Sequence, residues 1–134
     1  NEERFEKPVL GEVKAGYDLL IDENFEGYEQ VTQDDYYRGD FFLRVVGDSM
    51  SGAHIHDGDL LYVKKCQDVP SGTIAVALIG RSEVTVKKVI KKEGLLILQP
   101  ANPSVDARYY SKEEVESLPV EIIGKALYSR SDLV

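Results

Sequence analysis

From Phe41 onward, the hydrophobic positions fall into short runs that predict β-strands. The runs are rich in branched and aliphatic side chains, and they span 41–46, 60–65, 73–79, 83–90, 95–100 and 120–128. Most are bounded by Gly, Pro, Asp, Asn or Ser, and the gaps between the middle runs are short, as in antiparallel meanders. The pattern predicts a mainly β fold, a folded-over or barrel-like sheet with little helix.

The chain before Phe41 has no comparable pattern. Residues 1–7 are polar and are interpreted as the remnant of a linker, so that one domain spans 8–134. The stretch 8–37 is mixed and turn-rich, with Gly11, Gly16 and Gly27 expected to interrupt regular structure.

One short helix is expected near the C-terminus. The segment SKEEVESL at 111–118 combines helix-forming residues with the spacing of a capping box between Ser111 and Glu114. One or two helical turns are predicted there.

Length and composition fit a single globular domain. The chain has 134 residues, 43% of them hydrophobic and 30% charged, which is enough to bury a core without cross-links. The single cysteine, Cys66, excludes an internal disulfide framework and predicts a reducing, cytoplasmic location. No apolar run is long enough for a membrane span, and no signal-peptide pattern follows Asn1. Because the first residue is not Met, we interpret the chain as a fragment or processed form.

Charge is distributed unevenly along the chain. The net charge is −8, and residues 1–49 carry 13 acidic against 5 basic side chains, whereas 50–134 carry 11 of each. An acidic surface repels phosphate, so this chain alone is expected to be a poor nucleic-acid binder. Any work on DNA would require another domain.

A candidate nucleophile lies in the segment GDSM at 47–50. Ser49 follows a hydrophobic strand, in a turn begun by Gly47 and Asp48. Such a turn can present a hydroxyl and leave backbone N–H groups free to stabilise an oxyanion. Taken alone, Gly-Asp-Ser is also an ordinary turn sequence.

A candidate base lies in the strand EVTVKKV at 83–89. A lysine acts as a general base only when neutral, so burial among apolar groups must lower its pKa. Strand alternation places Lys88 with the valines and Lys87 with Glu83 and Thr85. Alternation alone therefore favours Lys88, and two solvated lysines remain the ordinary interpretation.

A third segment, PVLGEVKAGYDLL at 8–20, contains the adjacent small residues Ala15 and Gly16. Small side chains allow a peptide bond to enter a narrow active site. By itself the pair is uninformative.

Together, these segments resemble the self-cleaving repressor family, which comprises LexA, the lambdoid phage CI-type repressors and the UmuD-like mutagenesis proteins. The family is similar in its catalytic core to type I signal peptidases. The resemblance covers Pro8 to about Leu127 and is carried by PVLGEVKAG, ENFEGY, FFLRVVGDSM, HIHDGDLLYV and EVTVKKV. The sequence departs from the common pattern at His54, where glycine is frequent, and at Tyr17, where proline or a small residue is frequent; Tyr17 bears on how the cleavage loop fits.

The resemblance implies specific site residues. It assigns Ser49 as nucleophile, Lys87 as general base and Ala15-Gly16 as the scissile bond, with backbone amides of Ser49 and Met50 as oxyanion donors. It therefore favours Lys87 over Lys88, and a bulge or strand twist would reconcile this choice with the alternation.

The resemblance also implies a biological role without a cofactor. A homodimeric domain of a transcriptional repressor would cut itself, stimulated by a RecA–single-stranded-DNA filament, and so separate from an N-terminal helix-turn-helix domain that holds operator DNA. Two alternatives stay open: a non-cleaving dimerisation module controlled by a phage antirepressor, and a UmuD-like polymerase accessory subunit. We expect no membrane partner.

Other chemistry is less favoured by the residues. His54 and His56 lie near Ser49 in sequence, and Asp57 or Asp59 could orient a histidine, but Asp-Gly-Asp is better interpreted as a turn before a strand. Two histidines two residues apart can chelate a metal, yet no further ligand set is apparent, so no metal site is predicted. Cys66 has no base at a recognisable spacing and is interpreted as incidental.

Overall fold

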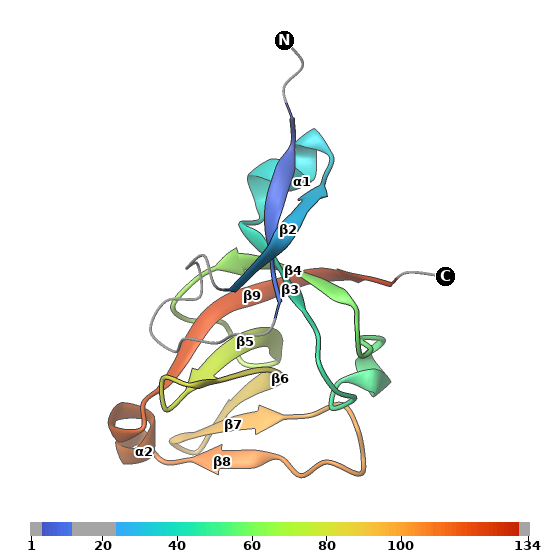
Figure 1. Cartoon of the computed structure of the whole chain (residues 1–134). Coiled ribbons are helices and arrows are strands. Elements are labelled where there is room, and N and C mark those ends of the chain that lie inside the picture. Colours follow the sequence, from blue (N-terminus) through green and yellow to red (C-terminus); the bar gives the residue numbers. More distant parts are fainter. Residues whose placement is uncertain (1–3, 12–23, 132–134) are drawn as a thin grey trace.

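The computed structural model describes residues 4–11 and 24–131 (Figure 1). Strands account for about half of this part of the chain. They are β1 (Glu6–Leu10), β2 (Phe25–Gln30), β3 (Phe41–Arg44), β4 (Leu60–Lys65), β5 (Thr73–Ile79), β6 (Glu83–Lys92), β7 (Leu95–Gln99), β8 (Arg108–Tyr110) and β9 (Val120–Arg130). The helices are α1 (Gln33–Arg38), the 3-10 turn η2 (Ser51–Ala53) and α2 (Lys112–Ser117).

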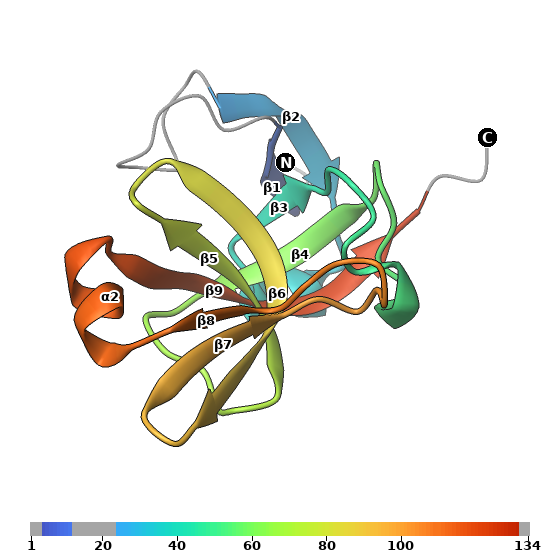
Figure 2. The same cartoon turned by 90° about the horizontal axis from the view of Figure 1, so that it is seen from below.

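All nine strands form one sheet in the order β2-β1-β3-β4-β9-β5-β6-β7-β8. Only β1 and β3 run parallel, while every other neighbouring pair is antiparallel. The sheet twists and folds over, so that β1 and β2 project at one end and β7 and β8 lie at the other (Figures 1 and 2). The predicted fold class, a mainly β folded sheet with little helix, is confirmed.

Folding the sheet encloses three apolar clusters, and β5 contributes to two of them. Val76 belongs to a cluster with Phe41 and Met50, whereas Ala75 and Ala77 belong to a cluster with Leu98. Alternate side chains of a strand point to opposite faces, so a strand covered on both sides needs a continuous apolar run. The sequence TIAVALI provides that run.

The first third of the chain is more regular than predicted. β1 begins at Glu6, two residues before the predicted domain boundary, and pairs with β2. Gly27 lies inside β2 opposite Val9 with φ +153°, beside a register shift between Val9 and Leu10, so it disturbs the pairing locally without ending the strand. β1 and β2 are short strands whose alternation was obscured by charged side chains on the exposed face.

The two α-helices are short and capped. Ser111 and Glu114 form both hydrogen bonds of the capping box at the start of α2, as the sequence predicted. Thr32 caps α1, which the hydroxyls of Tyr62 and Tyr128 fasten to the sheet through Asp35. None of the helices among the described residues is long and apolar enough to cross a membrane.

Candidate active site

Ser49 lies in the turn that follows β3, and a second turn holds this one in place. Gly47 has φ +88°, a left-handed conformation that favours glycine, and its N–H donates to Asp57 Oδ1 at 2.8 Å. The N–H of Val45 donates to the carbonyl of Asp59 at 2.8 Å. The Asp-Gly-Asp segment therefore acts as the predicted turn into β4 and as a brace for the serine turn.

The loop after β7 supports the serine turn from another direction. The N–H of Ala101 donates to the carbonyl of Ser49 at 2.8 Å, and the N–H of Gly52 donates to the carbonyl of Ala101 at 2.7 Å. Asn102 Nδ2 donates to the carbonyl of Asp48 at 3.0 Å. A Cβ at Gly52 would lie 2.5 Å from the oxygen of Ala101, so only glycine allows this approach.

Lys87 on β6 reaches Ser49 directly. Its Nζ lies 3.0 Å from Ser49 Oγ and 2.6 Å from Thr85 Oγ1. The lysine is 8% exposed, and within the described residues no carboxylate forms an ion pair with it. Across the sheet, Lys87 and Thr85 face Ala75 and Ala77, whose small side chains leave room beside the amine.

Burial lowers the pKa of Lys87 because the charged ammonium loses water. The positive charge of Arg108 lowers the Lys87 pKa further, while Glu83 opposes it. Arg108 itself holds Glu83 in a two-pronged ion pair, with distances of 3.1 and 2.5 Å, and the same bonds lower the pKa of Glu83. Burial and the positive charge of Arg108 therefore favour the neutral amine that a general base requires.

The structure distinguishes the two adjacent lysines. Lys87 is buried and Lys88 is exposed, which is the reverse of the preference inferred from strand alternation. The register between β5 and β6 runs from Thr73–Val89 to Ile79–Glu83 without a bulge, so the suggested bulge is not the explanation. Alternation failed because the face of β6 that carries Lys87 and Val89 is covered there, whereas the face of the valines is open at Lys88.

A cleft of about 270 Å³ opens beside Ser49 and Lys87. Its walls are largely apolar and include Leu43, Val45, Val84 and Val86. β7 pairs with β6 only from Lys88 onward, so within the described chain the outer edge of β6 at 83–87 has no strand partner. An extended peptide could form backbone hydrogen bonds along this edge.

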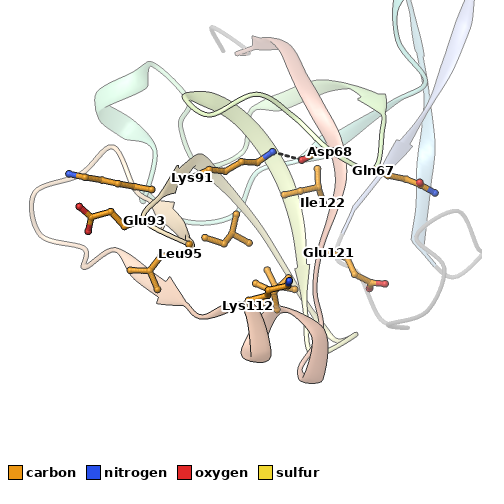
Figure 3. Close-up of a pocket in the computed structure, with 13 residues that line it drawn as sticks. Gln67, Asp68, Lys91, Glu93, Leu95, Lys112, Glu121 and Ile122 are labelled. Carbon is orange, nitrogen blue, oxygen red and sulfur yellow. Dashed lines mark hydrogen bonds and ion pairs between the residues drawn. The ribbon is translucent and has the colours of Figure 1, made fainter.

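A second, wider pocket of about 770 Å³ lies elsewhere (Figure 3). It is formed by the β6–β7 hairpin, α2 and β9, and Lys91 and Asp68 make an ion pair within it. Neither Ser49 nor Lys87 lines it, so its size does not identify the site.

The alternative ligands and nucleophiles are not assembled into a site. His54 and His56 are exposed, and their backbones form hydrogen bonds with Ser129 and Asp59. Asp59 is buried and accepts from the N–H of His56 and the hydroxyl of Ser131, which is a turn-stabilising role. The described part of the chain contains no group of three or more metal-ligating side chains. Cys66 is half-buried and packs against the second apolar cluster.

The predicted scissile bond, Ala15-Gly16, and Tyr17 lie outside the described residues. The residues that flank this segment are described. Gly11 lines the cleft beside Ser49, and its N–H donates to the carbonyl of Asn24 at 2.9 Å. The last described residue before Ala15-Gly16 therefore lies beside the cleft.

Sequence reasoning missed two groups that complete the arrangement, Arg108 and the pair Ala101-Asn102. Arg108 belongs to a three-residue strand, and no motif marked it. The segment Pro-Ala-Asn-Pro around Ala101 is a turn sequence, which predicts a loop but not its contact with Ser49.

Comparison with known proteins finds matches along most of the chain. The family model described as Peptidase S24-like matches residues 8–127. The chain is 42% identical over 122 residues to the LexA repressor of Erwinia tasmaniensis, covering 87% of this chain and 59% of that protein. It is 36% identical over 122 residues to the LexA repressor of Lacticaseibacillus casei, covering 90% and 59%, and 45% identical over 96 residues to that of Edwardsiella ictaluri, covering 71% and 47%. The chain thus spans about half to three fifths of the length of these relatives.

Proposed function

The chain belongs to the Peptidase S24-like family, and on that premise we propose that it is the C-terminal, self-cleaving domain of a LexA-like transcriptional repressor. Ser49 is the nucleophile, Lys87 the general base and Ala15-Gly16 the bond that is cut. The observation that carries the proposal is the 3.0 Å contact between Ser49 Oγ and a buried Lys87 with no carboxylate paired to it within the described residues.

The chemistry follows from this contact. Neutral Lys87 takes the proton of the Ser49 hydroxyl as Oγ attacks the carbonyl carbon of Ala15. The tetrahedral intermediate collapses to an ester between Ser49 and Ala15, and Lys87 returns the proton to the leaving amine of Gly16. Water, deprotonated by Lys87, then hydrolyses the ester. Because the scissile bond is tethered to the nucleophile, its effective concentration is high. Each chain carries one such bond and therefore cuts once.

The backbone around Ser49 supports the proposed oxyanion donors. Within the described residues, neither the N–H of Ser49 nor that of Met50 donates a hydrogen bond to another group. Both residues line the cleft. Free N–H groups beside the nucleophile are what stabilisation of a developing oxyanion requires.

The position of Gly11 supports cleavage within one chain. Ala15 follows Gly11 by four residues, a reach of up to about 14 Å for an extended chain. Since Gly11 lines the same cleft as Ser49, Ala15-Gly16 lies within reach of the nucleophile without crossing the sheet.

We also propose that the domain forms a homodimer through β9. Gly124 and Lys125 of β9 are paired on both sides, with β4 and with β5, whereas 126–130 pair only with β4 among the described strands. The free edge can accept a second copy across a two-fold axis. Dimer formation by size-exclusion chromatography with light scattering, abolished by Leu127→Lys, would support this role.

The remaining partners follow from the family and the charge. A RecA–single-stranded-DNA filament would stimulate cleavage by binding the cleavable conformation better than the resting one. Operator DNA would bind a separate N-terminal domain, because this chain has net charge −8. The protein would act in the cytoplasm.

The test is incubation of the purified chain at neutral and strongly alkaline pH, with intact mass as readout. Fragments 1–15 and 16–134 should appear faster as pH rises, because deprotonation of Lys87 activates it. Ser49→Ala and Lys87→Ala should abolish them, and Lys88→Ala, the matched control, should still cut. A folded chain whose mass stays constant at every pH would refute self-cleavage.

Such a refutation would favour the first alternative, a dimerisation module controlled by an antirepressor protein. The sequence of the full-length protein distinguishes the repressor from the second alternative, a UmuD-like polymerase accessory subunit. A helix-turn-helix domain before Asn1 would exclude the accessory subunit. The relatives named above are LexA repressors, which favours the repressor.

A further inference from the structure

The loop at 101–102 binds the two carbonyl groups nearest the nucleophile. Asn102 Nδ2 donates to the carbonyl of Asp48 at 3.0 Å, and the N–H of Ala101 donates to the carbonyl of Ser49 at 2.8 Å. The loop approaches from the side opposite the cleft. Ala101 and Asn102 line a separate groove with Gly52, whereas Ser49 and Met50 line the cleft.

Each of these carbonyls shares a peptide plane with one proposed oxyanion donor. The carbonyl of Asp48 belongs to the peptide unit whose N–H is that of Ser49, and the carbonyl of Ser49 belongs to the unit whose N–H is that of Met50. A trans peptide is planar, and its C=O and N–H point in opposite directions. Holding both carbonyls from behind therefore directs both N–H groups toward the cleft.

Asn102 is itself fixed for this task. Its Oδ1 accepts the N–H of Ser104 at 2.9 Å, and its carbonyl accepts the N–H of Val105 at 3.1 Å. Because Oδ1 is engaged in this turn, the amide can present only its Nδ2 to Asp48. A hydrogen bond to a carbonyl also polarises the N–H of the same peptide unit, which strengthens it as a donor.

Building on the proposed self-cleavage, we infer that Asn102 is a positioning residue whose amide aims the backbone N–H of Ser49 at the oxyanion of the scissile peptide, while the adjacent N–H of Ala101 aims that of Met50. It touches neither the substrate nor Lys87. Its loss should impair stabilisation of the tetrahedral intermediate while leaving the nucleophile and its base in contact.

Two reactions at residue 49 separate these effects. Self-cleavage passes through an oxyanion, whereas alkylation of a thiol by iodoacetamide is a direct displacement that forms none. The alkylation is measured on Ser49→Cys in a Cys66→Ser background, so that a single thiol reacts. Its rate and pH dependence report the access and ionisation of the side chain at position 49.

Asn102→Ala should slow self-cleavage at least tenfold across the pH range, short of the roughly 10²–10³-fold lost when an oxyanion donor is removed outright. In the thiol background, the same substitution should leave the alkylation rate and its pH midpoint unchanged. Asn102→Asp, which keeps an acceptor for Ser104 but loses the donor to Asp48, should behave like Asn102→Ala and guards against a loop that fails to fold.

Two results would overturn the inference, and a third would refute the proposed function on which it rests. Cleavage by both Asn102 variants at the wild-type rate would show that the Asn102 amide does not orient the backbone N–H groups of the serine turn. Cleavage and alkylation slowed equally would show a general disturbance of the serine turn. An unmodified chain that never cuts, although its Ser49→Cys counterpart is alkylated, would instead refute the proposed function on which the inference rests.

Discussion

Gly52→Ala should damage the active site without touching either member of the proposed Ser–Lys pair. A Cβ at position 52 would lie 2.5 Å from the oxygen of Ala101, and ordinary contact begins at 3.4 Å. The carbonyl of Ala101 must therefore retreat by about 0.9 Å. This stretches the 2.7 Å hydrogen bond from Gly52 beyond useful length.

The cost can be worked out from these contacts. One lost hydrogen bond contributes about 1 kcal/mol, and the forced shift adds about 1–2 kcal/mol of strain. The N–H of Ala101, which donates to the carbonyl of Ser49, moves together with the carbonyl of Ala101. Misplacing a reacting group by about 1 Å costs up to about 10²-fold in rate, so self-cleavage should fall about 10- to 100-fold.

The assay pairs urea unfolding with the rate of self-cleavage at alkaline pH. Gly94→Ala is the matched control, since Gly94 has φ +76° with open space around it and lies in the β6–β7 hairpin, away from the cleft. It should lose about 1 kcal/mol of stability and keep its cleavage rate. Unchanged cleavage by Gly52→Ala, or an equal loss in Gly94→Ala, would refute the reasoning.

Two further predictions concern Lys87. Arg108→Gln removes a positive charge that lowers the Lys87 pKa, and it leaves Glu83, which raises that pKa, without its ion pair. The pH profile of self-cleavage should therefore move to higher pH while the rate on the alkaline plateau stays the same. A pH profile that does not move would contradict this prediction. Lys87→Met should raise the free energy of unfolding at neutral pH by about 1–3 kcal/mol, because it removes a buried ammonium. Since the folded pKa of Lys87 is lowered, the unfolded chain binds more protons between that pKa and 10.5, so wild-type stability should rise with pH there and the gap to Lys87→Met should narrow. In urea unfolding, a difference in stability between wild type and Lys87→Met that does not change with pH would count against this.

The fold was predictable where strands are long and apolar. The run at 73–79 matches β5 to the residue, and 120–128 falls within β9. β1, β2 and β8 were not predicted, because short strands at the sheet's periphery need few apolar residues and carry charges on their open faces. Pairing of β1 with β2 across the intervening segment is a tertiary choice that no local pattern encodes.

The site was only partly predictable, and for a different reason. The resemblance identified Ser49 and Lys87, and the structure brings them into contact. Their catalytic roles stay predictions until cleavage is measured. The supporting contacts from Asn102 and Arg108 depend on loops and short strands that meet the site only after folding, so sequence spacing carried no sign of them.

The choice between the adjacent lysines shows what decides such a site. Alternation assumes one apolar and one solvated face, and that assumption gave Lys88. In the folded sheet, the face of β6 that carries Lys87 is covered and the other face is open at Lys88, so the burial of each lysine depends on what lies over its own face. Lys87 faces Ala75 across the strand pair, whereas Lys88 is exposed. Within the described residues Lys87 is buried without a carboxylate ion-pair partner, which costs stability while the amine is charged, and this cost fits the proposed role of the neutral amine as a base.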